Sequence, residues 1–170
     1  KNTETSIWTS PDGKTYMTVT TPFYGAGEEL QLMEMSIDIS EQKKFEESLA
    51  VREKYFTTIF EESPLGIALI DSLTGKIIQV NNYFSKIAGK SKSELTDLTW
   101  MDLTHPDDVQ EDLDNMAALN AGKISGFNME KRYIKPDGKE SWINKTVANV
   151  SVEGNKHIHL AMIEDITKKK

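Results

Sequence analysis

Three histidines are the first residues of this chain whose types could bind a metal ion or a haem. His157 and His159 stand two residues apart on an expected strand, so they share a face and could bind one metal ion together. No third ligand accompanies this pair, so we expect two ordinary histidines there and no metal site. His105 directly precedes Pro106, a residue that favours the first position of a helix, so we expect His105 at the N-cap of that helix and not as a ligand.

The segment after His105 is acidic and could bind a divalent cation through carboxylate oxygens. Its acidic residues are Asp107, Asp108, Glu111, Asp112 and Asp114. On a helix this spacing distributes the carboxylates around the axis rather than focusing them on one point. We therefore expect a solvated acidic face, opposite a buried stripe formed by Val109, Leu113 and Met116.

Other motifs of enzyme chemistry are missing from the 170 residues. The chain holds no cysteine, which excludes thiol nucleophiles, cysteine zinc sites and the thiol adduct that light-sensing flavin domains form. It also lacks a Gly-x-Ser-x-Gly turn and a Gly-x-x-x-x-Gly-Lys phosphate loop. A formal net charge of −7 disfavours nucleic acid as a partner, and no apolar run is long enough to cross a bilayer. We expect a non-catalytic segment that contacts neither nucleic acid nor membrane.

Two parts of the chain repeat each other. Pro11-Asp12-Gly13-Lys14 recurs as Pro136-Asp137-Gly138-Lys139, and Asp38-Ile39-Ser40 is echoed by Asp165-Ile166-Thr167. Between these anchors each copy is expected to form a β-hairpin, with strands 15–24 and 29–37 in the first copy and 140–152 and 156–166 in the second. The turn of the second hairpin is expected at Glu153-Gly154-Asn155. The chain is thus expected to open with the closing hairpin of one unit, to contain a complete second unit, and to be a piece of a longer protein.

The end of each hairpin is a candidate signal-exit junction, by which we mean Asp38, Ile39 and Ser40 in the first copy and Asp165, Ile166 and Thr167 in the second. In each, the aspartate can hold the strand end by hydrogen bonds, and the hydroxyl of the serine or threonine can cap the helix that follows. We expect this junction to be stiff, so that a shift of the strand tilts the helix.

Residues 41–60 are expected to form an amphipathic connecting helix. Phe45, Leu49, Phe56 and Ile59 recur at nearly helical spacing, with charged and polar residues between them. This apolar stripe can pack against its own domain or form a coiled-coil seam with a second chain, and the sequence leaves both open.

The middle of the chain supplies the rest of a sheet and several short helices. Strands 66–71 and 76–80 form a hairpin, a helix capped by Asn81 or Asn82 ends before Gly89, and a long strand covers 124–135. The fold class is therefore α+β, with a five-stranded antiparallel sheet in the order ββ-helices-βββ and the helices on one face. The expected domains are an upstream closing hairpin (1–40), a linker helix (41–60), a complete domain (61–167) and the start of an output helix (168–170).

Six segments in this order resemble a PAS domain with its C-terminal PAC portion over residues 55–167. They are Pro64-Leu65-Gly66-Ile67-Ala68, Gln79-Val80-Asn81-Asn82-Tyr83-Phe84, Ile87-Ala88-Gly89, His105-Pro106-Asp107-Asp108, Glu130-Lys131-Arg132-Tyr133 with Asp137-Gly138 and Trp142, and Glu164-Asp165-Ile166-Thr167. Residues 1–40 resemble only the closing strands of an upstream PAS domain.

This resemblance implies a sensory and dimerisation module, usually cytoplasmic, that passes a signal to an effector domain. Tandem PAS units most often belong to sensor histidine kinases that act in a phosphorelay, and diguanylate cyclases are the alternative parent. In haem-binding PAS domains, the iron ligand resembles a histidine later on the helix before the long strand. Residues 109–122 of this chain hold no histidine, so a haem of that type is not expected. The cofactor is left unknown.

The resemblance also implies a ligand cavity between sheet and helices. The apolar candidates for its lining are Phe84, Ile87, Trp100, Met101, Leu103, Met116, Phe127, Met129, Ile143, Val147, Leu160 and Met162. We expect no charged residues to converge on this cavity, so the sequence favours a neutral or weakly polar small molecule as its ligand.

A filled core is the alternative, and it would make the chain a structural dimerisation spacer. We expect a homodimer through the 41–60 helix or through the sheet.

Overall fold

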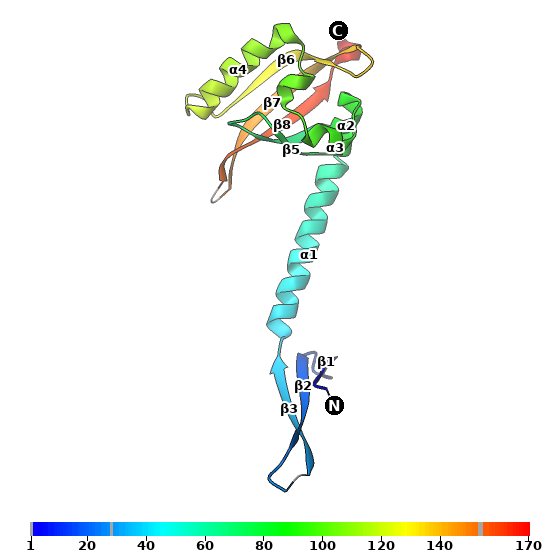
Figure 1. Cartoon of the computed structure of the whole chain (residues 1–170). Coiled ribbons are helices and arrows are strands. Elements are labelled where there is room, and N and C mark those ends of the chain that lie inside the picture. Colours follow the sequence, from blue (N-terminus) through cyan, green and yellow to red (C-terminus); the bar gives the residue numbers. More distant parts are fainter. Residues whose placement is uncertain (1, 28, 153–154) are drawn as a thin grey trace. The chain divides into compact units, whose positions relative to one another are not determined.

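A computed structural model of the chain describes residues 2–27, 29–152 and 155–170. The chain forms two compact units, Lys1–Phe56 and Thr57–Lys170 (Figure 1). Helix α1 (Ser40–Glu61) contributes residues to both units.

The first unit is a three-stranded antiparallel sheet with β2 in its centre. Its strands are β1 (Glu4–Thr9), β2 (Thr15–Tyr24) and β3 (Leu30–Asp38). The predicted hairpin of β2 and β3 is confirmed. Strand β1 was not predicted, and it pairs with β2 from Glu4 opposite Thr20 to Thr9 opposite Thr15. Ile7 and Trp8 are the apolar residues of β1, so this short strand carries little hydrophobic pattern to read.

The Pro-Asp-Gly-Lys turns of the two copies adopt the same local conformation. Gly13 has φ 85° and Gly138 has φ 78°, a left-handed conformation that favours glycine because it has no Cβ. Each turn joins a preceding strand to the strands that follow, so the sequence repeat is a repeat of three strands.

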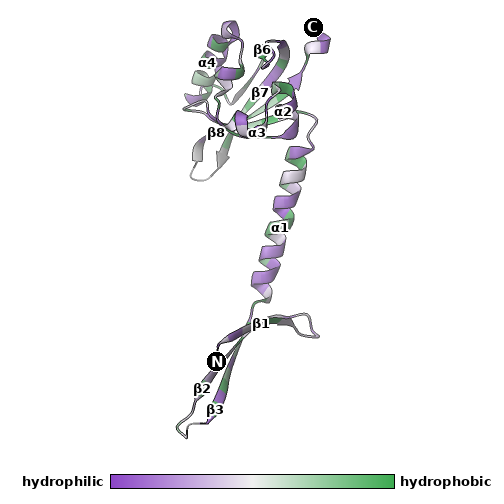
Figure 2. Ribbon diagram, turned by 45° about the vertical axis from the view of Figure 1, so that its right-hand side comes forward, coloured by the Kyte–Doolittle hydropathy of each residue, from purple (hydrophilic) through white to green (hydrophobic). Residues whose placement is uncertain are grey.

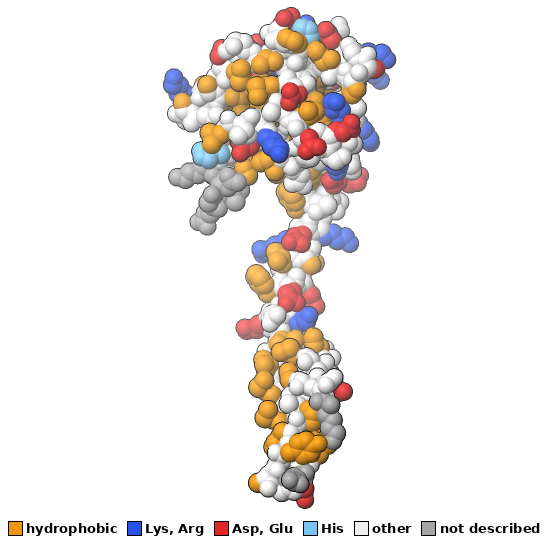
Figure 3. All heavy atoms as spheres, viewed as in Figure 1, with side chains coloured by type: hydrophobic (Ala, Val, Ile, Leu, Met, Phe, Trp, Pro, Cys, Tyr) orange, Lys and Arg blue, Asp and Glu red, His pale blue; other side chains and the backbone are white. Residues whose placement is uncertain are grey.

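Large apolar side chains of the first sheet and of α1 are exposed (Figure 3). In Figure 2 the ribbons of the first sheet and of α1 carry both hydrophobic residues in green and hydrophilic residues in purple. On β3 they include Leu32, Met33 and Met35, while Thr18 on β2 is buried. Apolar residues recur along these strands, and within the first unit no described helix or second sheet covers them.

The second unit contains the predicted five-stranded antiparallel sheet, in the order β5-β4-β8-β7-β6. Its strands are β4 (Gly66–Asp71), β5 (Ile77–Val80), β6 (Gly126–Ile134), β7 (Glu140–Val152) and β8 (Asn155–Asp165). Part of the turn expected at Glu153-Gly154-Asn155 lies outside the described residues. The α+β class and the ββ-helices-βββ order are confirmed.

Short helices between β5 and β6 lie over one face of this sheet (Figure 1). They are α2 (Asn82–Ala88), α3 (Lys92–Thr96), the 3-10 turn η1 (Trp100–Leu103) and α4 (Pro106–Asn120), and a second 3-10 turn, η2 (Thr167–Lys169), follows β8. Asn81 caps α2 by accepting a hydrogen bond from Phe84 N, and Gly89 ends the helix at φ 67°, both as predicted.

The core lies between these helices and the inner face of the sheet. On β8 the inner positions are His159, Ala161 and Ile163, which are buried, whereas Leu160 and Met162 are only partly buried. Because side chains alternate between the faces of a strand, Leu160 and Met162 point away from the core. The prediction that Leu160 and Met162 face the helices is therefore wrong.

No helix among the described residues combines the length and the apolar character needed to span a bilayer.

Candidate functional site

Most of the predicted cavity residues do lie together in the core of the second unit. Those that are buried there are Phe84, Ile87, Trp100, Leu103, Met116, Ile143 and Val147, and Met101 and Phe127 pack against them while partly buried. Met129 is buried but is not a member of this group. Leu160 and Met162 are not part of this group.

A cluster of three charged residues is buried among these apolar side chains, and we call it the charge cluster: Asp112 on α4, Lys131 on β6 and Lys145 on β7. The side chains of Asp112 and Lys131 are 0% exposed, and that of Lys145 is 2% exposed. The Lys131 Nζ donates to Asp112 Oδ2 at 2.6 Å, and the Lys145 Nζ donates to Oδ1 at 2.6 Å and to Oδ2 at 2.7 Å. One carboxylate thus serves two ammonium groups in the interior.

Asp112 was predicted on a solvated face of its helix, and this prediction is wrong. The buried residues of α4 are Asp112, Met116 and Leu119, whereas Leu113 is 38% exposed. The helix is rotated from the expected stripe because the two inward lysines of the sheet attract the carboxylate. The sequence signal lies in those lysines, which occupy positions between inward apolar residues of β6 and β7.

Aromatic rings and one hydroxyl surround the two ammonium groups. The Trp100 ring centroid lies 4.9 Å from the Lys131 Nζ and 4.9 Å from the Lys145 Nζ. Lys131 also lies 5.1 Å from the Tyr133 ring and donates to Thr104 Oγ1 at 2.7 Å. The negative faces of the rings partly offset the excess positive charge.

Burial changes the protonation behaviour of the charge cluster. Desolvation, followed by the nearby charge of Lys145, lowers the pKa of Lys131 to about 7 against the pull of Asp112. Desolvation also lowers the pKa of Lys145, again against Asp112, and raises that of the Tyr133 phenol. The expectation that no charged residues converge on this interior is therefore wrong. The prediction of a neutral or weakly polar ligand rested on that expectation and loses its support.

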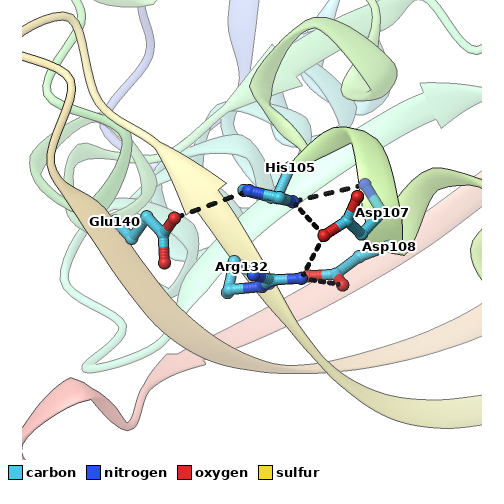
Figure 4. A network of polar contacts seen from close by, with 5 residues as sticks. All are labelled: His105, Asp107, Asp108, Arg132 and Glu140. Atoms are coloured by element: carbon cyan, nitrogen blue, oxygen red, sulfur yellow. Dashed lines mark hydrogen bonds and ion pairs between the residues drawn. The ribbon is translucent and has the colours of Figure 1, made fainter.

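His105 occupies the N-cap of α4, as predicted, with its Nδ1 accepting a hydrogen bond from Asp107 N at 3.2 Å (Figure 4). Beside it, the guanidinium of Arg132 on β6 binds Asp108 with two nitrogens, Nε to Oδ2 at 3.0 Å and Nη2 to Oδ1 at 2.7 Å. The backbone N of Arg132 also donates to Asp108 Oδ2, at 2.8 Å. Glu140 lies 3.5 Å from the other nitrogen of the imidazole. The network fastens the start of α4 to β6, and the Arg132 guanidinium lowers the pKa of Asp108.

We expect Asp108→Ala to lower the free energy of unfolding by about 2 kcal/mol at pH 7, because its charged hydrogen bonds to Arg132 are lost. Asp107→Ala is the control, since Asp107 is 74% exposed and contacts Arg132 only at 3.5 Å, and it should change this free energy by less than about 0.5 kcal/mol. Urea unfolding at several pH values measures both. The difference between wild type and Asp108→Ala should begin to shrink as the pH falls below about 4, the ordinary pKa of a carboxyl group, because the carboxylate stabilises the fold only while ionised. It should vanish only when the pH falls through the lowered pKa of Asp108 in the folded chain.

Among the described residues, no group of three potential metal ligands gathers around His157 and His159. His157 is exposed, and His159 is buried with its Nδ1 lacking a hydrogen-bond partner. Burial, and then the charge of Lys145, lowers the pKa of His159.

The two exit junctions share one hydrogen-bond pattern. In the second, Asp165 Oδ1 accepts from Thr167 N at 2.9 Å, and Thr167 Oγ1 accepts from Trp142 N at 3.0 Å. In the first, Asp38 Oδ1 accepts from Ser40 N at 3.0 Å, and Ser40 Oγ accepts from Thr15 N at 2.9 Å.

The backbone of each junction is held in the same way, since Ile166 N donates to Trp142 O and Ile39 N donates to Thr15 O. The aspartates hold the strand ends as predicted. The predicted capping role of Ser40 and Thr167 is corrected, since their hydroxyls bind the neighbouring strand instead.

Comparison with known proteins identifies the second unit. The family model described as PAS fold matches residues 77–163, slightly more than half of the chain. The chain belongs to the PAS family. PAS domains are non-catalytic modules of sensory signalling, so the chain is a signalling sensory module.

The proteins that are similar to the chain include two curated proteins and one solved structure. The probable diguanylate cyclase DgcE of Escherichia coli strain K12 is 34% identical over 132 residues, which cover 77% of this chain and 12% of that protein. The sensor histidine kinase TmoS of Ectopseudomonas mendocina is 27% identical over 124 residues, covering 72% of this chain and 13% of that protein. The chain thus spans about an eighth of the length of these relatives. The crystal structure of the PAS domain of an HTR-like protein from Haloarcula marismortui has a TM-score of 0.64 and 22% identity, and covers 73% of this chain and 99% of that one.

Within the PAS unit, by which we mean Thr57–Lys170, the buried Asn81 joins the incoming helix to the domain. Its Nδ2 donates to Phe60 O at 2.8 Å and to Leu65 O at 2.9 Å. Its Oδ1 accepts from Ile67 N and from Phe84 N, both at 2.9 Å. The sequence predicted that Asn81 or Asn82 caps this helix, but not the three bonds that tie the end of α1 and the start of β4 to the Asn81 side chain.

Proposed function

We propose that the PAS unit detects a small ligand or mediates dimerisation, and that it relays its state through the second exit junction to an effector domain. The repeated hydrogen-bond pattern of the exit junctions carries this proposal, because the same connection follows both copies of the closing strands. A connection made by side-chain bonds to a neighbouring strand resists bending, so movement of the strand is passed to the helix that follows. The proposed location of the module is the cytoplasm.

The proposed effector is a histidine kinase of a phosphorelay, and the similarity to the sensor histidine kinase TmoS supports it. A diguanylate cyclase is the second candidate, favoured by the higher identity to the probable diguanylate cyclase DgcE. Both parents require the same action of the PAS unit, namely passing a change of its core to a following segment.

Dimerisation through the 41–60 helix is proposed on the apolar residues of α1. Phe45 is 71% exposed and Ile59 is 70% exposed, and Leu49 between them is also exposed. Burial of such side chains against a second copy would stabilise a dimer by about 1.5–3 kcal/mol for each that is fully covered. The outer face of the sheet, with Leu160 and Met162, is the alternative surface for a dimer.

Native mass spectrometry of the purified chain, combined with an absorption spectrum, tests the proposal. A discrete extra mass or a visible absorption band would support ligand sensing and identify the ligand class. A bare dimer would favour the structural dimerisation spacer, and a bare monomer that no small molecule stabilises would contradict both forms of the proposal.

Asp165→Ala is expected to weaken coupling to the effector in the full-length parent, while ligand binding stays nearly intact. The substitution removes the acceptor for Thr167 N at the end of β8, so the following segment is released from the strand. The output activity of the effector, with and without stimulus, measures the coupling.

Two variants serve as controls for Asp165→Ala. Asp165→Asn keeps an oxygen acceptor and should retain most of the coupling. Glu164→Ala removes a neighbouring carboxylate, which forms a surface ion pair with the exposed Lys169, and should leave the coupling unchanged. Unchanged output in Asp165→Ala would contradict the role of the exit junction.

A further inference from the structure

The charge cluster carries an excess positive charge when all of its members are ionised. It contains two lysines and one aspartate, and all three are buried. Both ammonium nitrogens lie within 2.7 Å of the same atom, Asp112 Oδ2. Two like charges that share one counterion in a dry interior repel each other strongly, because the low local dielectric weakens their interaction much less than water would.

The groups that face the cluster from neighbouring elements do not remove this excess. Asp108, also on α4, attracts the proton of Lys131, but Arg132 binds that carboxylate with two nitrogens. Tyr133 on β6 faces Lys131 with its ring, and burial keeps its phenol neutral. His159 on β8 stays neutral because of burial and the charge of Lys145.

Loss of one proton therefore relieves the cluster of its excess charge. The lowered pKa values of both lysines agree with this charge balance, and that of Lys131, at about 7, lies in the physiological range. Since the two lysines share Asp112, the proton belongs to the cluster as a coupled unit rather than to one residue.

We propose that the Asp112, Lys131 and Lys145 cluster is a proton-binding site, and that the PAS unit uses it to sense pH. The proton is then the ligand of the sensor, which deepens the proposed sensory function and rests on it for its biological meaning. Binding the proton creates a second ammonium on Asp112 and so changes the contact of α4 with β6 and β7. Strand β7 also carries Trp142, whose backbone N–H and carbonyl hold the second exit junction. A change at the cluster thus has a continuous route to the exit.

Nuclear magnetic resonance of the lysine Nζ groups in the 170-residue chain tests the proposal directly. One buried lysine signal in the wild type should lose its ammonium character with a midpoint near pH 7, while exposed lysines keep theirs to about pH 10. The signal should be absent in Lys131→Met. Lys123→Met, at an exposed position, is the matched control and should leave the titration unchanged.

Chemical unfolding of the same proteins gives a second measurement. Between about pH 7 and pH 10 the unfolded chain binds one more proton than the folded chain, so the unfolding equilibrium constant should fall by about tenfold per pH unit. The lysine therefore contributes a rise in stability with rising pH in this window. Lys131→Met should flatten this dependence, and Lys123→Met should not.

Two results would overturn the proposal. The first is a wild-type chain in which both buried lysines remain ammonium groups to about pH 9.5. The second is a titration midpoint that rises when acetate or phosphate is added, because the excess charge would then be balanced by an anion and the site would be an anion site. The wild-type titration stands even if Lys131→Met does not fold. If no buried lysine titrates near pH 7, the pH-sensing proposal fails, but the native mass spectrometry test of the proposed function is unaffected. Failure of the pH-sensing proposal can therefore be distinguished from failure of the proposed function.

Discussion

Replacing Asp112 with alanine is expected to lower the free energy of unfolding of the PAS unit by about 3–5 kcal/mol at pH 7. The substitution removes the carboxylate that the buried Lys131 and Lys145 share. Each lysine must then either keep a buried charge without a counterion or lose a proton. An isolated domain is stable by about 5–15 kcal/mol, so the loss is a large fraction of the total. Urea unfolding followed by the fluorescence of Trp100, which lies against both lysines, measures it.

The penalty of Asp112→Ala should depend on pH with a definite sign. Without the carboxylate, the pKa values of both lysines fall further, because Asp112 is the group that raises them. The folded variant then binds fewer protons than its unfolded state, so its stability rises as the pH rises toward about 10. Unfolding at pH 7 and at pH 9.5 should show the deficit relative to wild type shrinking at the higher pH.

Two matched variants separate the charge effect from simple truncation. Asp114 lies on the same helix, and its exposed side chain accepts a hydrogen bond from Gln110, so Asp114→Ala should cost less than about 0.5 kcal/mol. The triple variant Asp112→Leu, Lys131→Met, Lys145→Met replaces the whole cluster by apolar groups and should recover most of the stability. If Asp112→Ala were as stable as Asp114→Ala, Asp112 would not be the buried counterion.

The strand order of the PAS unit could be predicted because its signals are local. The Pro-Asp-Gly turns, the Gly89 helix end and the His105-Pro106 helix start each fix a boundary through the chemistry of one or two residues. Strand β1 was not predicted because a short strand with two apolar residues has no clear hydrophobic periodicity. Its pairing with β2 identifies it as a strand. The face of β8 was predicted wrongly for a related reason, since both Leu160 and Ala161 are apolar and only pairing with β4 and β7 decides which points inward.

The charge cluster lay beyond sequence reasoning for a different reason. A single lysine on a strand, or a single aspartate among five acids on a helix, is normally solvated. Burial of Lys131, Lys145 and Asp112 is favourable only when all three meet, and their meeting depends on the packing of α4 on the central strands. The apolar periodicity of the helix predicted burial of Leu113 rather than Asp112, because this pattern contains no information about partners on the sheet.

Replacing Asn81 with alanine is the second substitution with a large expected effect, about 3–5 kcal/mol, for a reason that involves no charge. Asn81 is fully buried and uses its side-chain amide for four hydrogen bonds. Alanine leaves two backbone N–H groups and two carbonyls without this partner, and loss of the helix cap alone costs about 1 kcal/mol. Urea unfolding gives the total, and amide hydrogen exchange at Ile67 and Phe84 reports the two released N–H groups.

Neighbouring variants divide the effect of Asn81→Ala into its parts. Asn82→Ala changes the next residue, which is exposed and contributes its backbone N–H to Glu61, so it should cost less than about 0.5 kcal/mol. Asn81→Ser keeps an oxygen that can accept from Phe84 N, so it should recover about 1 kcal/mol and protect that amide but not Ile67. If Asn81→Ser restored full stability, Asn81 would be a helix cap alone. Partial recovery would instead mean that the bonds to Phe60 and Leu65 stabilise the junction between α1 and the PAS unit, and that a movement of α1 acts on the same side chain that begins α2.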